Sequence, residues 1–229
     1  MPPLVRGEVD RLPVLVADVA PGEPASERIR VQEMLSYLAA SLPAASARAR
    51  LLALQCSLRA GRSGRVRLPA GLLRGMRLAH DYTLWQDLED ARWLRLPLID
   101  ASGYRSVSPQ IMDDFSVAAP RHERTRAAGW ALRITGDRRL RRLSPAARVT
   151  ALALSAHTPV GVEGSWDAAQ LLRVCGLPAQ SRLRPVLAGL TDAGVLSSWT
   201  TDNDRDIHWR LPGHVLEQSA EISVIPPGS

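Results

Sequence analysis

Four polar residues that follow a Gly-Leu-Pro turn are the best candidates for molecular recognition: Gln180, Ser181, Arg182 and Arg184. Arginine can donate two hydrogen bonds to one guanine, and glutamine can pair with adenine through its amide. Side chains of these types, close together near the start of an expected helix, could therefore hydrogen-bond to base edges. We therefore expect these four side chains to read bases, and the alternative is an exposed polar helix face.

The positive charge of the chain is concentrated in its middle. The net charge is +6, and all 29 basic residues are arginines. Because Ala, Leu and Pro are also abundant, as in proteins of GC-rich genomes, the placement of the arginines matters more than their number. Residues 31–100 hold ten arginines and six acidic residues, residues 101–143 hold nine and four, and residues 144–229 hold six and eight. A basic middle region favours polyanionic partners such as nucleic acids.

Several arginines of this region, and two arginines in expected hairpins, are candidates for contact with DNA phosphates. The alternative for each of them is a solvated basic surface, above all for the run Arg138-Arg139-Leu140-Arg141-Arg142. The candidates are Arg62, Arg65, Arg67, Arg74, Arg77, Arg105, Arg138, Arg139, Arg141, Arg142 and Arg205.

The sequence lacks the patterns that catalysis or metal binding would need. The five histidines have no partner pattern for a nucleophile or a general base, and Cys56 and Cys175 lie in apolar patterns typical of buried free thiols. Residues 202–206 begin like a calcium loop, but Ile207 and Gly213 stand where such a loop needs glycine and glutamate. We expect a protein that is not an enzyme and that holds no metal and no cofactor.

An internal repeat organises the chain. Residues 47–61 read ARARLLALQCSLRAG and residues 147–161 read ARVTALALSAHTPVG, with Ala-Arg, Leu-Ala-Leu and Gly in the same places. Further matches follow in the same order at offsets of 99 to 102, which indicates loops of slightly different length. The ordered series predicts two copies of one structural unit.

The second copy is the easier one to interpret. Ser144-Pro145 predicts a helix start, because a hydroxyl can cap a helix and Pro is tolerated in its first turn. Ser165 is expected to cap a short second helix. Pro185 requires the third helix, near 181–193, to begin late or irregularly. The strand-like runs that close the unit are Val195–Thr200 and Ile207–Leu211.

The run LPAQSRLRPVLAGLTDAGVL, residues 177–196, resembles the recognition helix and first wing strand of the winged helix-turn-helix DNA-binding superfamily. The resemblance covers residues 144–212 well and, through the repeat, residues 44–108 less closely. It implies a mainly α fold with small β-hairpin wings (α+β), arranged as two tandem winged-helix domains. Such tandem arrangements occur in bacterial regulators and plasmid replication initiators, so the resemblance identifies a superfamily and not one function.

The third helix of the first copy, expected near 82–92, differs from its counterpart in charge. Because carboxylates are repelled by DNA phosphates, this helix is a poor reader of the major groove. We therefore expect the first copy to be a backbone clamp or a dimer surface. The exposed positions of its third helix include Gln86, Asp87, Glu89 and Asp90.

These observations divide the chain into five parts. They are an N-terminal extension with an amphipathic helix (1–43), a first winged-helix domain (44–108), a basic helical linker (109–143), a second winged-helix domain (144–214) and a tail (215–229). The amphipathic helix, near 26–42, offers an apolar surface for a dimer, as most such proteins bind two-fold sites. The residues of that surface are Met34, Leu35, Leu38 and Leu42.

The leading hypothesis is a sequence-specific double-stranded DNA-binding protein, a bacterial transcriptional regulator that forms a homodimer through its N-terminal helix or first winged helix. Two alternatives stay open: a plasmid-type replication initiator that binds origin repeats, and a tandem winged-helix scaffold that binds proteins. The sequence has no run of roughly 18 apolar residues for a membrane span and no signal-peptide pattern, so we expect a cytoplasmic, nucleoid-associated protein. The presence of a small-molecule effector stays open.

Overall fold

The computed structural model describes residues 24–78, 81–96, 106–112, 118–158, 162–203 and 205–212. This part of the chain is mainly helical, with three small antiparallel sheets, which confirms the expected α+β class at that level. None of the described helices is both long enough and apolar enough to cross a membrane. Arg105 and the expected tail, residues 215–229, lie outside the described residues.

Residues 144–212, which we call the C-terminal unit, form a helix, a strand, two further helical segments and a hairpin. The last strand is the central one, so the strand order is β5-β7-β6 and both pairings are antiparallel. Ile207 and Trp209 of the central strand are buried and alternate with exposed residues, so one face of the sheet packs on the core. The elements are α6 (Pro145–His157), β5 (Glu163–Asp167), α7 (Ala168–Cys175), η2 (Gln180–Arg182), α8 (Leu183–Asp192), β6 (Ser198–Asp202) and β7 (Asp206–Arg210).

Local sequence signals set the ends of these helices. Ser144 Oγ accepts a hydrogen bond from the backbone N–H of Ala147 at 3.2 Å, so the expected start of α6 is confirmed. The third helical segment begins with the 3-10 turn η2 and continues as α8, the irregular start that Pro185 requires. Gly176 ends α7 with a φ of +64°, a conformation that glycine adopts without a Cβ clash.

The expectation that Ser165 caps the second helix is wrong. Ser165 lies within β5, where it is paired with His208 of β7. The cap is Asp167, whose Oδ1 accepts a hydrogen bond from the backbone N–H of Gln170 at 2.7 Å. The sequence of β5, Glu-Gly-Ser-Trp-Asp, has few residues that favour strands. This strand therefore depends on pairing with β7, and the local sequence does not indicate it.

Residues 46–111, which we call the N-terminal unit, have the same order of elements. Strand β1 pairs with β3, β2 pairs with β4, and Arg65 forms an isolated bridge with Gln110. The segment that contains β3 and β4 therefore lies between the other two strands, as β7 does in the C-terminal unit. The elements are α2 (Ala47–Arg59), β1 (Leu68–Pro69), α3 (Ala70–Gly75), α4 (Thr83–Asp90), β2 (Leu94–Arg95), β3 (Ser106–Val107) and β4 (Gln110–Ile111).

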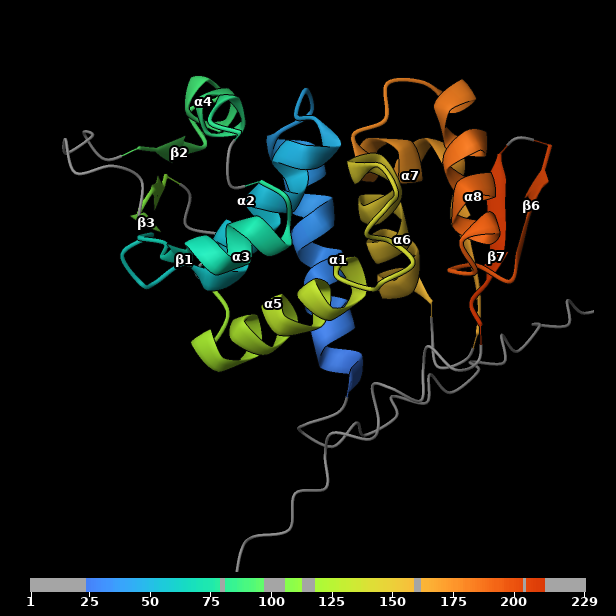
Figure 1. Cartoon of the computed structure of the whole chain (residues 1–229), viewed down its shortest axis with the longest axis horizontal. Coiled ribbons are helices and arrows are strands. Elements are labelled where there is room, and N and C mark those ends of the chain that lie inside the picture. Colours follow the sequence, from blue (N-terminus) through green and yellow to red (C-terminus); the bar gives the residue numbers. More distant parts are fainter. Residues whose placement is uncertain are drawn as a thin grey trace, which may run out of the picture.

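Helix α1 (Pro24–Ser41) lies between the two units and packs against α2, α6, α7 and the connecting helix α5 (Arg121–Thr135) (Figure 1). The apolar surface that we expected to mediate a dimer is therefore covered within the chain, because helices of both units pack on it. Its four residues are at most 3% exposed, and so is the neighbouring Val31; the four are Met34, Leu35, Leu38 and Leu42.

Two buried arginines connect the units through backbone carbonyls. Arg50 of α2 donates a hydrogen bond to the carbonyl oxygen of Val174, near the end of α7, at 3.4 Å. Arg148 of α6 donates to the carbonyl oxygen of Met76, just after α3, at 3.1 Å. The first helix of each unit thus contacts the end of the second helix of the other unit. The buried apolar residues of both units belong to one core.

We expect Leu38→Ala to lower the free energy of unfolding by about 2–5 kcal/mol, because it removes buried methyl groups and leaves a cavity between the units. Urea unfolding followed by circular dichroism should still show one transition, since one core serves both units. The control is Ile29→Ala on the same helix, where the side chain is exposed and the change should stay within about 0.5 kcal/mol. Two separate transitions in Leu38→Ala would contradict the shared core.

Candidate nucleic-acid interface

The segment formed by η2 and α8 has one apolar face and one polar face. Leu183, Leu187 and Leu190 are at most 1% exposed, and α8 packs against α6. The opposite face is exposed, and it carries arginines at its N-terminal end and Asp192 at its C-terminal end. All four residues expected to read bases lie together at the N-terminal end of this exposed face: Gln180, Ser181, Arg182 and Arg184.

The two arginines of this face differ in their contacts. Arg184 Nη2 donates a hydrogen bond to Thr201 Oγ1 of β6 at 3.5 Å, so the Arg184 side chain lies toward the sheet. The Arg182 side chain is exposed and forms no hydrogen bond or ion pair with the residues that the structure describes, and only its backbone N–H donates, to the carbonyl oxygen of Ala179. The guanidinium of Arg182 therefore keeps its donors available for a ligand outside the chain.

The sheet of the N-terminal unit has a basic outer face. Gln110 is paired with Arg65 on one side and with Arg95 on the other, so these three exposed side chains form one row across the sheet. Arg67 is exposed two residues after Arg65 and lies on the same face. The buried residues of the inner face are Val66, Leu68, Leu94 and Ile111.

Arg95 was not among the residues that the sequence singled out. The pattern that could have indicated it is a strand in which a buried Leu94 alternates with an exposed Arg95. A strand of two residues is too short for such an alternation to be recognised in the sequence. Arg62, also exposed, lies in the turn that leads to this sheet. That turn needs glycine at position 64, where φ is +73° and a Cβ would lie 2.6 Å from the carbonyl oxygen of Ile111.

The sheet of the C-terminal unit carries the opposite charge at one end. Asp167, Asp206 and Asp202 are directly paired across the three strands and form one acidic row. Like charges paired directly across strands repel one another, so this row is a surface that phosphates avoid. Arg205 is exposed next to Asp206, which weakens it as a candidate phosphate contact.

Helix α4, the counterpart of η2 and α8, has an acidic outer surface. Asp87 and Asp90 are exposed, as expected, and so is Gln86. Glu89 is half-buried, and its Oε1 accepts a hydrogen bond from the backbone N–H of Leu96 at 2.9 Å. The two units thus place opposite charges on equivalent elements: a basic helix with an acidic sheet in one unit, and an acidic helix with a basic sheet in the other.

The arginines that follow α5 differ in whether they bind within the chain or are exposed. Arg139 donates hydrogen bonds to both carboxylate oxygens of Asp137 and, at 2.8 Å, to the carbonyl oxygen of Gly194 after α8. The hydrogen bond with Asp137 raises the pKa of Arg139. Because its guanidinium is bound within the chain, we no longer count Arg139 among the DNA contacts. Arg138 and Arg142 are exposed.

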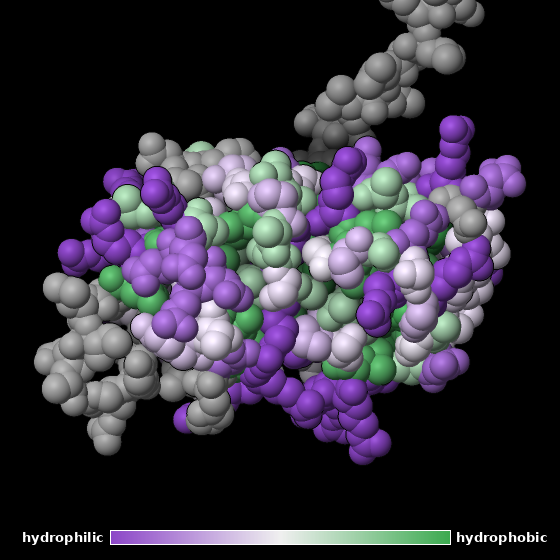
Figure 2. Space-filling view, turned by 90° about the horizontal axis from the view of Figure 1, so that it is seen from above, coloured by the Kyte–Doolittle hydropathy of each residue, from purple (hydrophilic) through white to green (hydrophobic). Residues whose placement is uncertain are grey.

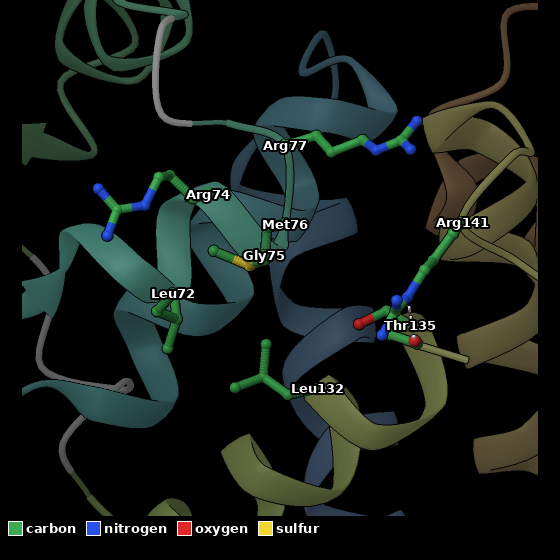
Figure 3. Close-up of a pocket in the computed structure, with 9 residues that line it drawn as sticks. Leu72, Arg74, Gly75, Met76, Arg77, Leu132, Thr135 and Arg141 are labelled. Carbon is green, nitrogen blue, oxygen red and sulfur yellow. Dashed lines mark hydrogen bonds between the residues drawn. The ribbon is translucent and has the colours of Figure 1, made fainter. Parts of the chain in front are cut away.

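A cavity of about 550 Å³ separates the end of α3 from the end of α5. Three of the predicted arginines line it, namely Arg74, Arg77 and Arg141, together with apolar side chains. Figure 3 shows Arg77 and Arg141 on the same side of the cavity, whereas Arg74 points away from them. The Arg141 Nε donates a hydrogen bond to the carbonyl oxygen of Gly136 at 3.2 Å.

Most of the candidate residues therefore form three groups: the N-terminal end of η2 and α8, the outer face of the N-terminal sheet, and the cavity near α3. Arg138, Arg142 and Arg205 are exposed outside these groups. Figure 2 likewise shows hydrophilic side chains gathered at several places on one face, with apolar patches between them. The structure does not bring all the predicted arginines into a single continuous row.

We expect Arg139→Ala to lower the free energy of unfolding by about 1 kcal/mol, because it removes hydrogen bonds to Asp137 and Gly194 from a half-buried side chain. The neighbouring Arg138→Ala changes the net charge equally but removes an exposed side chain, and it should have an effect below about 0.5 kcal/mol. Urea denaturation of both variants measures the difference. Equal effects would mean that Arg139 has no structural role.

No family model matches the chain, and neither a curated protein nor a solved structure matches it.

Proposed function

We propose that this chain is a tandem winged-helix protein that binds double-stranded DNA sequence-specifically, as a transcriptional regulator. The order helix, strand, helix, helix, hairpin in both units supports the winged-helix assignment, as does the position of the last strand between the other two. The observation that carries the proposal is the exposed face of η2 and α8. A second helix that follows a tight turn is the element that enters the major groove in helix-turn-helix proteins.

In this proposal the C-terminal unit reads the sequence. Arg182 makes two hydrogen bonds to a guanine, and Gln180 and Ser181 contact neighbouring bases or phosphates. Arg184 contacts the backbone, since it already lies toward β6. The acidic row of Asp167, Asp206 and Asp202 faces away from phosphates.

The N-terminal unit holds the DNA backbone in this proposal. Arg65, Arg67 and Arg95 present three positive charges on one face, and arginine binds phosphate with two parallel hydrogen bonds. The acidic face of α4 does not enter a groove. A homodimer, if the regulator binds a two-fold site, uses this unit and not α1, because the apolar face of α1 is covered within the chain.

A plasmid-type replication initiator is the second candidate. The observation that favours it is that the C-terminal unit, with its basic helix, and the N-terminal unit, with its basic sheet, share one core. Such initiators combine a unit that reads bases with a unit that clamps the DNA backbone. Mapping of the bound sites distinguishes the two functions. Spaced repeats at a replication origin support initiation, and single operators at promoters support regulation.

The base-reading assignment is tested by selecting bound duplexes from a random pool with the wild type and with Arg182→Ala. We expect the variant to lose about 1–3 kcal/mol of preference at one base-pair position and to keep non-specific binding. Arg121→Ala, which removes an exposed arginine of α5, is the control and should keep the preference. An unchanged preference in Arg182→Ala would remove the assignment of α8. No duplex binding by the wild type at low salt would favour the protein scaffold.

The clamp assignment is tested by the salt dependence of binding to random duplex DNA. Each lost phosphate contact lowers the log–log slope by about 0.9, so we expect Arg65→Ala combined with Arg95→Ala to lower it by roughly 2. Arg121→Ala combined with Arg133→Ala removes the same charge from α5 and should leave the slope nearly unchanged. Equal changes in the two double variants would mean that only net charge matters.

A further inference from the structure

Two arginines at equivalent positions of the repeat reach the same turn. Arg48, in the first turn of α2, donates a hydrogen bond from Nη2 to the carbonyl oxygen of Arg77 at 3.2 Å. Arg148, in the first turn of α6, donates from Nη1 to the carbonyl oxygen of Met76 at 3.1 Å. Arginine side chains from the first turns of two helices thus bind adjacent carbonyl oxygens at residues 76–77.

Positive charge exceeds negative charge at this turn. Three arginines lie there, namely Arg48, Arg77 and Arg148. Among the described residues, the carboxylate that pairs with them is that of Asp81, whose Oδ2 lies 2.5 Å from Arg48 Nη1. Arg148 is 5% exposed, and its buried Nε has no hydrogen-bond partner in the described part of the chain. The pKa of Arg148 is lowered by burial first, and then by the nearby charges of Arg77 and Arg48. A buried cation in this state is stabilised by an anion.

The other fully buried arginines are different. Arg50 donates hydrogen bonds to the carbonyl oxygens of Ala45, Val174, Leu42 and Pro43. Arg124 donates to those of Ala119, Ser57 and Ala60. Burial lowers the pKa of both, but the Nε of each donates a hydrogen bond to a carbonyl oxygen. The unpaired Nε of Arg148 is therefore a property of this one junction, and burial of arginine alone does not explain it.

Arg77 has a backbone conformation that is unfavourable for arginine. Its φ is +59°, whereas the equivalent residue at the end of α7 is Gly176, with a φ of +64°. Glycine adopts this conformation without strain, and a residue with a Cβ does so at a cost in stability. The Arg77 side chain forms no hydrogen bond within the described ranges. Arg92 after α4 has the same conformation, with a φ of +56°, so what distinguishes Arg77 is its position in the wall of the cavity.

Arg77 also lines the cavity of about 550 Å³, and Met76, whose carbonyl oxygen binds Arg148, is part of its wall. Figure 3 shows Arg77 and Arg141 to the right of Leu72, Met76 and Leu132, with the Arg77 side chain extending to the upper right and the Arg141 side chain descending toward Thr135. A cavity of this size, lined by charged and apolar side chains, is typical of small-molecule sites. Planar guanidinium groups bind phosphate oxygens through paired hydrogen bonds.

We propose that this cavity binds a small phosphorylated molecule with an apolar body, such as a nucleotide. Arg77 and Arg141 hold the phosphate, and Arg48 and Arg148 strengthen the positive potential behind it. The apolar part of the ligand lies against Leu72, Met76 and Leu132. Because Arg77 belongs to the N-terminal unit and Arg141 directly precedes α6, the bound molecule contacts both sides of the junction between the units.

The test is isothermal titration calorimetry of the whole chain, without DNA, using inorganic pyrophosphate and ATP as probes. We expect saturable binding by the wild type, with ATP bound more tightly than pyrophosphate because of its apolar base. Arg77→Gly should weaken binding at least tenfold and leave the unfolding midpoint unchanged or raised, since glycine relieves the backbone strain.

Arg92→Gly is the matched control. Arg92 also has a positive φ, of +56°, is exposed after α4, and does not line the cavity. It should bind both probes as the wild type does. Absence of binding of both probes to the wild type would overturn the proposal, and so would equal loss in the two variants. Duplex DNA binding that depends on Arg77 while the probes do not bind would also overturn it, because the arginines would then contact DNA. None of these outcomes depends on the base-reading role of α8.

Discussion

The guanidinium of Arg50 is the contact on which the arrangement of the two units depends most. It donates hydrogen bonds to the carbonyl oxygens of Leu42 and Pro43 after α1, of Ala45 before α2, and of Val174 at the end of α7. Carbonyl oxygens at helix ends lack partners within the helix and carry partial negative charge. One cation therefore holds three helices together without a carboxylate, and its loss would remove all four of these hydrogen bonds.

The packing around Arg50 requires glycine at position 176. A Cβ at Gly176 would lie 2.7 Å from the carbonyl oxygen of Ala45 and 2.8 Å from Arg50 Nε, and the φ of +64° also favours glycine. The corresponding contact in the other direction, from Arg148 to Met76, is looser, because the Nε of Arg148 is unpaired. At one junction all three guanidinium nitrogens of Arg50 donate to carbonyl oxygens, whereas at the other the Nε of Arg148 has no hydrogen-bond partner among the described residues.

The same asymmetry extends to the outer surfaces. Equivalent elements carry opposite charges, since Arg182 is on the third helical segment of one unit and Asp87 is on that of the other. The sheets reverse this order, with Arg65 and Arg95 on one and a row of aspartates on the other. Two units with the same order of elements therefore present different surfaces, which suits a division between reading bases and holding the backbone.

The sequence by itself determined what depends on a few neighbouring residues. Ser144 caps α6 and Pro185 forces a 3-10 start before α8, because caps and proline act within one helical turn. Both cysteines are buried free thiols, as their apolar neighbours indicated, and burial raises the pKa of Cys175 to about 12. The polar face before α8 was likewise readable from its spacing.

Only the tertiary structure decided which of these residues meet. Ser165 pairs with His208 and becomes part of a strand, although its own sequence suggests a cap. Arg139 binds Gly194, 55 residues away, and is thereby removed from the candidate interface. The apolar face of α1 was visible in the sequence, but whether it is covered by a partner or by this chain depends on contacts with four helices. Such contacts join residues far apart in sequence, and their free energy is set by packing that no local pattern records.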